Sequence, residues 1–261
     1  MKAWKKVLAL LLTLMLALAL ASCSTAGNKP AGNHSQDEDP SVAGNKPAGD
    51  HSGDTTPRQS EQNKPEGTTS NVNWSLNNGM LTISGNGEMK DIPGGGGNRW
   101  DPTDWPWLVD KASITSVIIE PGVTTIGSEA FKDCINLSSV TIPDSVTWIG
   151  IYAFVGCDSL TSVNVPNSVT GTLNYTFAGC HNLKEATIGT GVESLENAFR
   201  DCPNLVSITI LGSNTQGYGL LACSDPALRK ALIQNCTIYA PAGSPVEAAC
   251  ELEGFNFSPL S

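Results

Sequence analysis

A short motif recurs four times in this chain and constrains the fold more than any other feature. Its copies read AFKDCINL from Ala130, AFVGCDSL from Ala153, TFAGCHNL from Thr176 and AFRDCPNL from Ala198. Each copy keeps a Phe, a Cys three residues later and a Leu three residues after that, and successive copies begin 23, 23 and 22 residues apart. A fixed period of about 20–29 residues is typical of a solenoid in which each repeat forms one coil.

The segments between the motif copies predict strands. After the first Leu comes the alternating stretch SSVTIP, in which Val140 and Ile142 would point inward and Thr141 outward. A second apolar contact follows, of the kind that Val146 and Ile149 supply. No repeat can bury this apolar face alone, so neighbouring repeats must stack into one continuous core. The sequence therefore predicts a β-rich, leucine-rich-repeat-like solenoid over residues 113–211.

The stretch GVTTIGSEAFKDCINLSSVTIPDSVTWIGIYAF, from Gly122 to Phe154, resembles the BspA-type leucine-rich repeats of bacterial surface proteins. The resemblance extends from about residue 72 to the C-terminus. It implies a leucine-rich-repeat fold and a role in adhesion or in contact with a host or matrix. The third repeat departs from the pattern with GTLNYTF, and the fourth is one residue short before its Phe. We expect these departures to change local turns and not the fold.

The segments before and after the repeats are typical of caps, which cover the otherwise exposed ends of a solenoid core. Over residues 72–112, VNWSLNNGMLTISG alternates on both sides of Asn78-Gly79 and predicts a hairpin, followed by an irregular loop. Residues 212–261 predict an irregular repeat and a C-terminal cap of two helices, each followed by a short strand. Their expected boundaries are an N-cap at Ser224 or Asp225 for the first helix, and Ser244 and Gly254 for the second.

The first 22 residues predict a secretory signal. Three lysines precede an apolar run that ends at Leu20, and this run is shorter than the ~20 residues of a membrane-spanning helix. The sequence LASC that ends at Cys23 resembles the lipobox of bacterial lipoproteins. The resemblance implies cleavage before Cys23 and a diacylglycerol on its sulfur, and two or more acyl chains give a stable membrane anchor.

Residues 23–71 predict a disordered tether, because they are mostly Gly, Pro and polar residues and offer little apolar surface to bury. His34 and His51 lie in two copies of one linker segment and make a poor metal site. The net charge is −10. Removal of the signal leaves 12 Lys and Arg against 25 Asp and Glu, a net charge of −13. Such an acidic chain lacks the basic surface that a nucleic-acid partner requires.

The four repeat cysteines could be metal ligands, disulfide partners, nucleophiles or core residues. Equivalent atoms in stacked strands lie along a line at about 4.8 Å intervals, so they cannot converge on one tetrahedral ion. Disulfides between cysteines of neighbouring repeats remain an alternative, since equivalent residues on adjacent strands lie within the Cα separation of a disulfide. The shared inward position favours reduced core thiols. Cys180 and His181 are adjacent, but the position of His181 carries a different residue in each of the other repeats and is expected at the surface. No catalytic dyad is therefore expected.

The outward positions of the predicted sheet carry small polar side chains and no convergent acid, base or nucleophile, which argues against catalysis. They form the candidate binding face: Ser139, Thr141, Ser162, Asn164, Glu185 and Thr187. No cofactor or metal is expected. The leading hypothesis is therefore a non-enzymatic, lipid-anchored surface protein that presents this face to another protein.

Two alternatives compete with that hypothesis. One is a cell-wall or carbohydrate-binding module that stacks sugars on Trp100, Trp105 and Trp107 of the loop before the repeats. The same tryptophans could instead seal the end of the solenoid. The other is a hydrolase built on residues 211–236, although no nucleophile and base stand out there.

Overall fold

The structure, a computed structural model of the chain, describes residues 66–69, 71–89 and 105–260. The proposed signal segment at 1–22, Cys23, the tether up to residue 65 and Trp100 lie outside the described residues. In the described part of the chain, no helix is long and apolar enough to cross a membrane.

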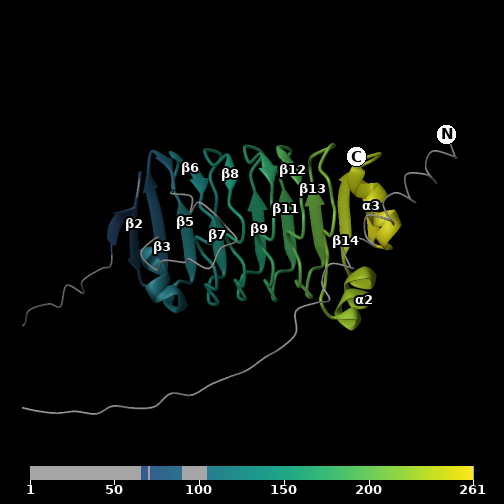
Figure 1. The fold of residues 1–261 in the computed structure, drawn as a ribbon, viewed down its shortest axis with the longest axis horizontal. Helices are drawn as coiled ribbons and strands as arrows, with labels where there is room; N and C mark the ends of the chain where they lie inside the picture. Colours follow the sequence, from purple (N-terminus) through teal and green to yellow (C-terminus); the bar gives the residue numbers. More distant parts are fainter. Residues whose placement is uncertain (1–65, 70, 90–104, 261) are drawn as a thin grey trace, which may run out of the picture. The chain divides into compact units, whose positions relative to one another are not determined.

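The expected repeat solenoid is present (Figure 1). Each coil contributes one strand to a row of parallel strands, which follow one another in chain order: β5 (Ser116–Ile119), β7 (Ser139–Thr141), β9 (Ser162–Val165), β11 (Glu185–Ile188) and β13 (Ser207–Ile210). A second strand follows in most coils and is shorter than the first except in the case of β6: β6 (Val123–Ile126), β8 (Trp148–Ile149), β10 (Gly171–Thr172) and β12 (Val192–Ser194).

The repeated motif forms the turn that closes each coil. Two residues of this turn adopt the left-handed conformation, the first at φ 51–59° and the second at φ 55–70°. The first position is held by Glu129, Tyr152, Tyr175, Asn197 and Gly219, and the second by Asp133, Gly156, Gly179 and Asp201. Main-chain hydrogen bonds join consecutive turns, as where the amide of Phe154 donates to the carbonyl oxygen of Thr176 at 2.9 Å.

The motif side chains form the core, as predicted. Phe131, Phe154, Phe177 and Phe199 are fully buried and stack on one another, with ring centroids 5.1–5.6 Å apart and interplanar angles of 9–19°. The motif cysteines and leucines are buried beside them. Dispersion and hydrophobic contacts thus run the length of the repeats as one ladder.

The N-terminal cap contains the expected hairpin of β2 (Val72–Asn77) and β3 (Met80–Gly85), and β3 pairs in parallel with β5. One boundary differs from prediction, because β1 (Glu66–Thr69) pairs antiparallel with β2 inside the range assigned to the disordered tether. A strand at a sheet edge gains main-chain hydrogen bonds without needing an apolar sequence, so composition did not reveal it. β4 (Gly87–Glu88) pairs with β6, and the 3₁₀ helix η1 (Pro106–Ser113) leads into the repeats.

The C-terminal cap also follows the sequence signals. Helix α2 (Pro226–Asn235) begins at Asp225, whose carboxylate accepts hydrogen bonds from the amides of Ala227 and Leu228. Helix α3 (Pro245–Glu253) begins at Ser244 and ends at Gly254, which has φ 80°. Strands β14 (Thr237–Pro241) and β15 (Asn256–Leu260) add two further parallel strands beyond β13.

The strand pairing, however, is not continuous. It stops between β7 and β9, and on the other side of the coils between β8 and β10, which leaves two five-stranded sheets where one had been expected. The amides of Gly189 and Leu211 donate to the preceding strand at 2.9 Å, but the equivalent residues after β7 and β9 are Pro143 and Pro166. Proline has no N–H to donate, so the step from β5 to β7 lacks this bond at Pro143 and the step from β7 to β9 lacks it at Pro166.

Candidate binding surfaces

The six residues of the candidate binding face lie on the outer side of β7, β9 and β11. Glu185 is paired with Ser162 and Thr187 with Asn164 in the parallel register of β11 and β9. Thr187 is half-buried and the other five are exposed, whereas Val163 and Ala186 between them point into the core. The structure brings four of the six together on one sheet. Ser139 and Thr141 lie on β7, the last strand of the other sheet.

This face offers hydroxyl, amide and carboxylate groups at regular intervals, which can donate and accept hydrogen bonds. In the described ranges, no group of three or more His, Cys, Asp or Glu side chains is placed to hold a metal ion. A cavity of about 240 Å³ lies elsewhere, lined by Leu108, Lys111, Lys132 and Asp133. Its lysines are already paired, Lys111 with Asp133 at 3.3 Å and Lys132 with Glu129 at 3.0 Å.

Trp105 and Trp107 do not form an exposed sugar-binding platform. Each side chain is 1% exposed. The indole Nε1 of Trp105 donates to the carbonyl oxygen of Ser128 at 3.0 Å, and that of Trp107 donates to Ala130 at 2.7 Å. The ring of Trp107 stacks on Phe131 at 6.0 Å and continues the Phe ladder. Both tryptophans therefore seal the end of the repeat core, and Trp100 lies outside the described residues.

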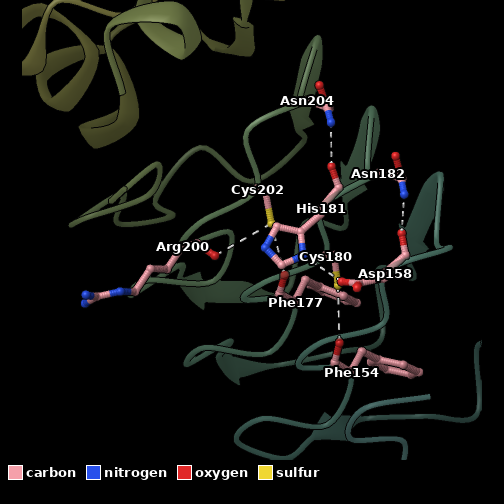
Figure 2. A network of polar contacts seen from close by, with 9 residues as sticks. All are labelled: Phe154, Asp158, Phe177, Cys180, His181, Asn182, Arg200, Cys202 and Asn204. Atoms are coloured by element: carbon pink, nitrogen blue, oxygen red, sulfur yellow. Dashed lines mark hydrogen bonds and ion pairs between the residues drawn. The ribbon is translucent and has the colours of Figure 1, made fainter. Parts of the chain in front are cut away.

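Figure 2 shows that Cys180 and His181 make separate polar contacts, Cys180 with Phe154 and His181 with Asp158. The thiol of Cys180 donates to the carbonyl oxygen of Phe154 at 3.2 Å inside the core. His181 Nδ1 lies 2.6 Å from Asp158 Oδ1, and both side chains are largely exposed. Burial raises the pKa of Cys180 to about 12, so its thiol is protonated at neutral pH. This pair therefore provides no activated nucleophile.

The sequence reasoning missed one set of surface residues. Three of the four tyrosines in the chain, Tyr152, Tyr175 and Tyr218, lie at the start of the closing turn in different coils. The rings of Tyr152 and Tyr175 are 5.3 Å apart, and the guanidinium of Arg200 lies 6.0 Å from the centre of the Tyr175 ring. Their recurrence at nearly the same repeat position was the signal that could have revealed them.

Residues 109–218 match the family model described as the BspA type leucine rich repeat region, with six copies. No curated protein was found to match the chain.

Three solved structures illustrate the proteins to which the chain is similar. A leucine-rich repeat protein from Eubacterium ventriosum ATCC 27560 is 18% identical, with a TM-score of 0.34 over 66% of this chain and 64% of that one. The T. pallidum leucine rich repeat protein is 16% identical, with a TM-score of 0.41 over 74% and 98%. A leucine rich cell surface protein from Faecalibacterium prausnitzii A2-165 is 24% identical, with a TM-score of 0.37 over 67% and 54%. The chain thus spans just under two thirds of the E. ventriosum protein.

Proposed function

We propose, from the BspA-type leucine-rich repeats that residues 109–218 form, that this chain is a non-enzymatic, lipid-anchored protein of the bacterial cell surface. In this proposal it binds a macromolecular partner, as in adhesion, through the face formed by Ser139, Thr141, Ser162, Asn164, Glu185 and Thr187. We call these six residues the sheet face.

The observation that carries this proposal is the regular register of the sheet face within each of the two sheets. Strand β9 pairs with β11, β7 pairs with β5, and apolar side chains pack beneath these strands. A surface of this kind can meet a large partner without first ordering a loop, which lowers the entropic cost of binding. Ser and Thr also lose little side-chain entropy when they are held in a complex.

Three lysine substitutions test the sheet face. The variant Thr141→Lys/Asn164→Lys/Thr187→Lys places long charged side chains across it and is expected to abolish binding of a partner captured by the full chain. Surface substitutions usually change stability by within about 0.5 kcal/mol, so the thermal midpoint is expected to stay nearly constant. The matched control Ser213→Lys/Asn214→Lys/Ala242→Lys adds the same charge at exposed positions away from the face. Normal binding by the sheet-face variant, or equal loss in the control, would refute this site.

The anchor needs its own test, because Cys23 lies outside the described residues. We expect Cys23→Ala to prevent lipidation and release the protein from the membrane fraction, since two or more acyl chains are what hold such a protein stably. Ser24→Ala serves as the control and is expected to stay with the membrane. Equal partitioning of Cys23→Ala and wild type would show that the chain is not anchored through this cysteine.

A further inference from the structure

On the sheet side, the step between β7 and β9 lacks the main-chain hydrogen bonds that join other coils. One step further along, the amides of Lys184 and Gly189 each donate to the preceding coil at 2.9 Å, before and after the pairing of β9 with β11. Their counterparts at the step from β7 to β9 are Thr161, whose amide makes no equivalent bond among the described residues, and Pro166, which has no N–H. The strands β7 and β9 do not pair either. The bonds before, within and after the strands are therefore all missing at this step.

The closing turns, in contrast, hold the same two coils together. The amide of Phe154 donates to the carbonyl oxygen of Thr176 at 2.9 Å, and the ring of Phe154 stacks on that of Phe177 with centroids 5.4 Å apart and planes inclined by 9°. The second row of strands keeps a bond at its start, where the amide of Thr170 donates to Thr147 at 2.9 Å, although β8 and β10 do not pair. The two coils are thus joined at the closing turns and separate at the sheet.

The inward side chains of β7 are partly exposed, unlike those of the other strands in this row. Val140 and Ile142 are half-buried, although they occupy the inward positions of the strand. The equivalent side chains of β5, β9, β11 and β13 are all at most 5% exposed: Val117, Ile119, Val163, Val165, Ala186, Ile188, Ile208 and Ile210. Solvent therefore reaches the core at the strand where the pairing stops.

We propose that the step between β7 and β9 is a hinge. The coils up to β7 form one rigid part and the coils from β9 onward form the other, because strand pairing is continuous within each. The two parts pivot about the closing turns, so that the separation of β7 and β9 changes while the Phe stack stays closed. Opening on the sheet side breaks no main-chain bond between these strands, whereas opening any neighbouring step of the sheet breaks several.

The hinge lies inside the sheet face. Strand β7 carries two of its six residues, and β9 and β11 carry the other four. Movement at the hinge therefore changes the curvature of this face, and a partner that contacts both parts favours the angle at which it binds best. The hinge itself does not depend on the proposed binding function, because it is measured in the absence of a partner.

The test is the distribution of distances between two spin labels on the full chain, measured by pulsed electron paramagnetic resonance. The labels are attached to cysteines introduced in a Cys23→Ala/Cys223→Ala background, because the remaining cysteines are buried. Each label pair spans three steps between coils, about 14 Å at the usual strand spacing.

The hinge pair carries labels at Ile118 of β5 and Thr187 of β11, which lie on the sheet side of the two parts. The turn pair, Lys132 and Arg200, joins the closing turns of the same two coils. The hinge pair is expected to give a broader distribution than the turn pair, because the parts separate at the sheet and stay together at the turns.

A third pair and two proline variants locate the movement. Labels at Asn164 and Tyr239 lie on the sheet side within the unbroken C-terminal sheet and are expected to give a narrow distribution. Pro166→Ala supplies an N–H at the step from β7 to β9 and is expected to narrow the distribution of the hinge pair. Pro143→Ala supplies one at the step from β5 to β7 and is the control, which is expected to leave it unchanged.

The comparison of the three pairs is made without either proline variant, so it does not depend on how those variants fold. A hinge-pair distribution no broader than those of the turn pair and the C-terminal pair would overturn the hinge. Equal narrowing by Pro166→Ala and Pro143→Ala would overturn its position between β7 and β9.

Discussion

The thiol of Cys157 donates a hydrogen bond to the carbonyl oxygen of Phe131, at 3.2 Å. Cys180 makes the same contact with Phe154 at 3.2 Å, and Cys202 with Phe177 at 3.1 Å. Each thiol joins two consecutive coils, because its acceptor lies 25 or 26 residues earlier in the chain. The repeated cysteine therefore fills a small apolar space and also satisfies a buried carbonyl group.

Replacement of one of the four repeat cysteines is expected to reduce the stability of the fold. We expect Cys180→Ala to lower the free energy of unfolding by about 1–3 kcal/mol, because it leaves a small void and removes the hydrogen-bond donor to Phe154. Cys223→Ala is the control, since Cys223 is half-buried and is not one of the four repeat cysteines. Urea unfolding of both variants measures the difference. Equal stability of the two variants would show that the thiol–carbonyl contacts contribute nothing.

The buried thiols predict a loss of stability at high pH. Burial raises the pKa of Cys134 to about 12 and that of Cys157 well above 9.0. Between pH 9 and 12 the unfolded thiols ionise while the folded ones keep their protons, so stability is fully present below pH 9 and falls as pH rises. Each such thiol contributes a slope of about 1.4 kcal/mol per pH unit. Chemical unfolding at several pH values is expected to give a shallower fall for Cys157→Ala than for the wild type, and parallel curves would contradict this origin.

Thr176 should be the least favourable residue of its turn. Its side chain is fully buried and its hydroxyl oxygen has no hydrogen-bond partner among the described residues, whereas the equivalent residues are Ala130, Ala153 and Ala198. A buried unsatisfied polar group costs about 1–3 kcal/mol, so Thr176→Ala is expected to raise the thermal midpoint. The reverse change, Ala153→Thr, should lower it. A lower midpoint for Thr176→Ala would mean that the methyl group of Thr176 contributes more through packing than its hydroxyl costs.

Trp107 is expected to act through stability. Trp107→Ala should lower the free energy of unfolding by about 3–5 kcal/mol, because it removes a fully buried ring from the end of the Phe ladder. Trp74 packs edge-on against Trp107 at 6.0 Å and is only partly buried, so Trp74→Ala should cost less. Urea unfolding monitored by circular dichroism compares the two, and a nearly normal midpoint for Trp107→Ala would contradict the sealing role.

The step between β7 and β9 should be the weak point of the repeats. The amide of Lys184 donates to Thr161 at 2.9 Å and that of Ser138 donates to Thr115 at 2.9 Å, but no equivalent bond joins Thr161 to Ser138 among the described residues. Amides without a partner exchange from more open states. Hydrogen exchange at Thr161 is therefore expected to be faster than at Lys184 and Ser138. Equal protection at all three amides would indicate that this step is as stable as its neighbours.

The sequence by itself determined the features that arise from local or strictly periodic signals. The motif period placed Phe, Cys and Leu in the core, and strand alternation placed Thr141 and Asn164 on the outer surface. Asn78-Gly79 marked the hairpin turn, while Ser244 and Gly254 marked the ends of α3. Each of these signals acts within one turn or one repeat, so it can be read without knowing where the rest of the chain lies.

Only the tertiary structure decided how neighbouring coils and caps meet. Pro143 follows β7, which still pairs with β5, and Pro166 follows β9, which does not pair with β7. The loss of one N–H therefore does not fix the outcome, which depends on the summed contacts between two coils. Trp105 and Trp107 were compatible with either a surface or a core, and their burial depends on carbonyl groups 23 residues away. Contacts of this range have no local sequence signature, because they form only when separate segments meet in the folded chain.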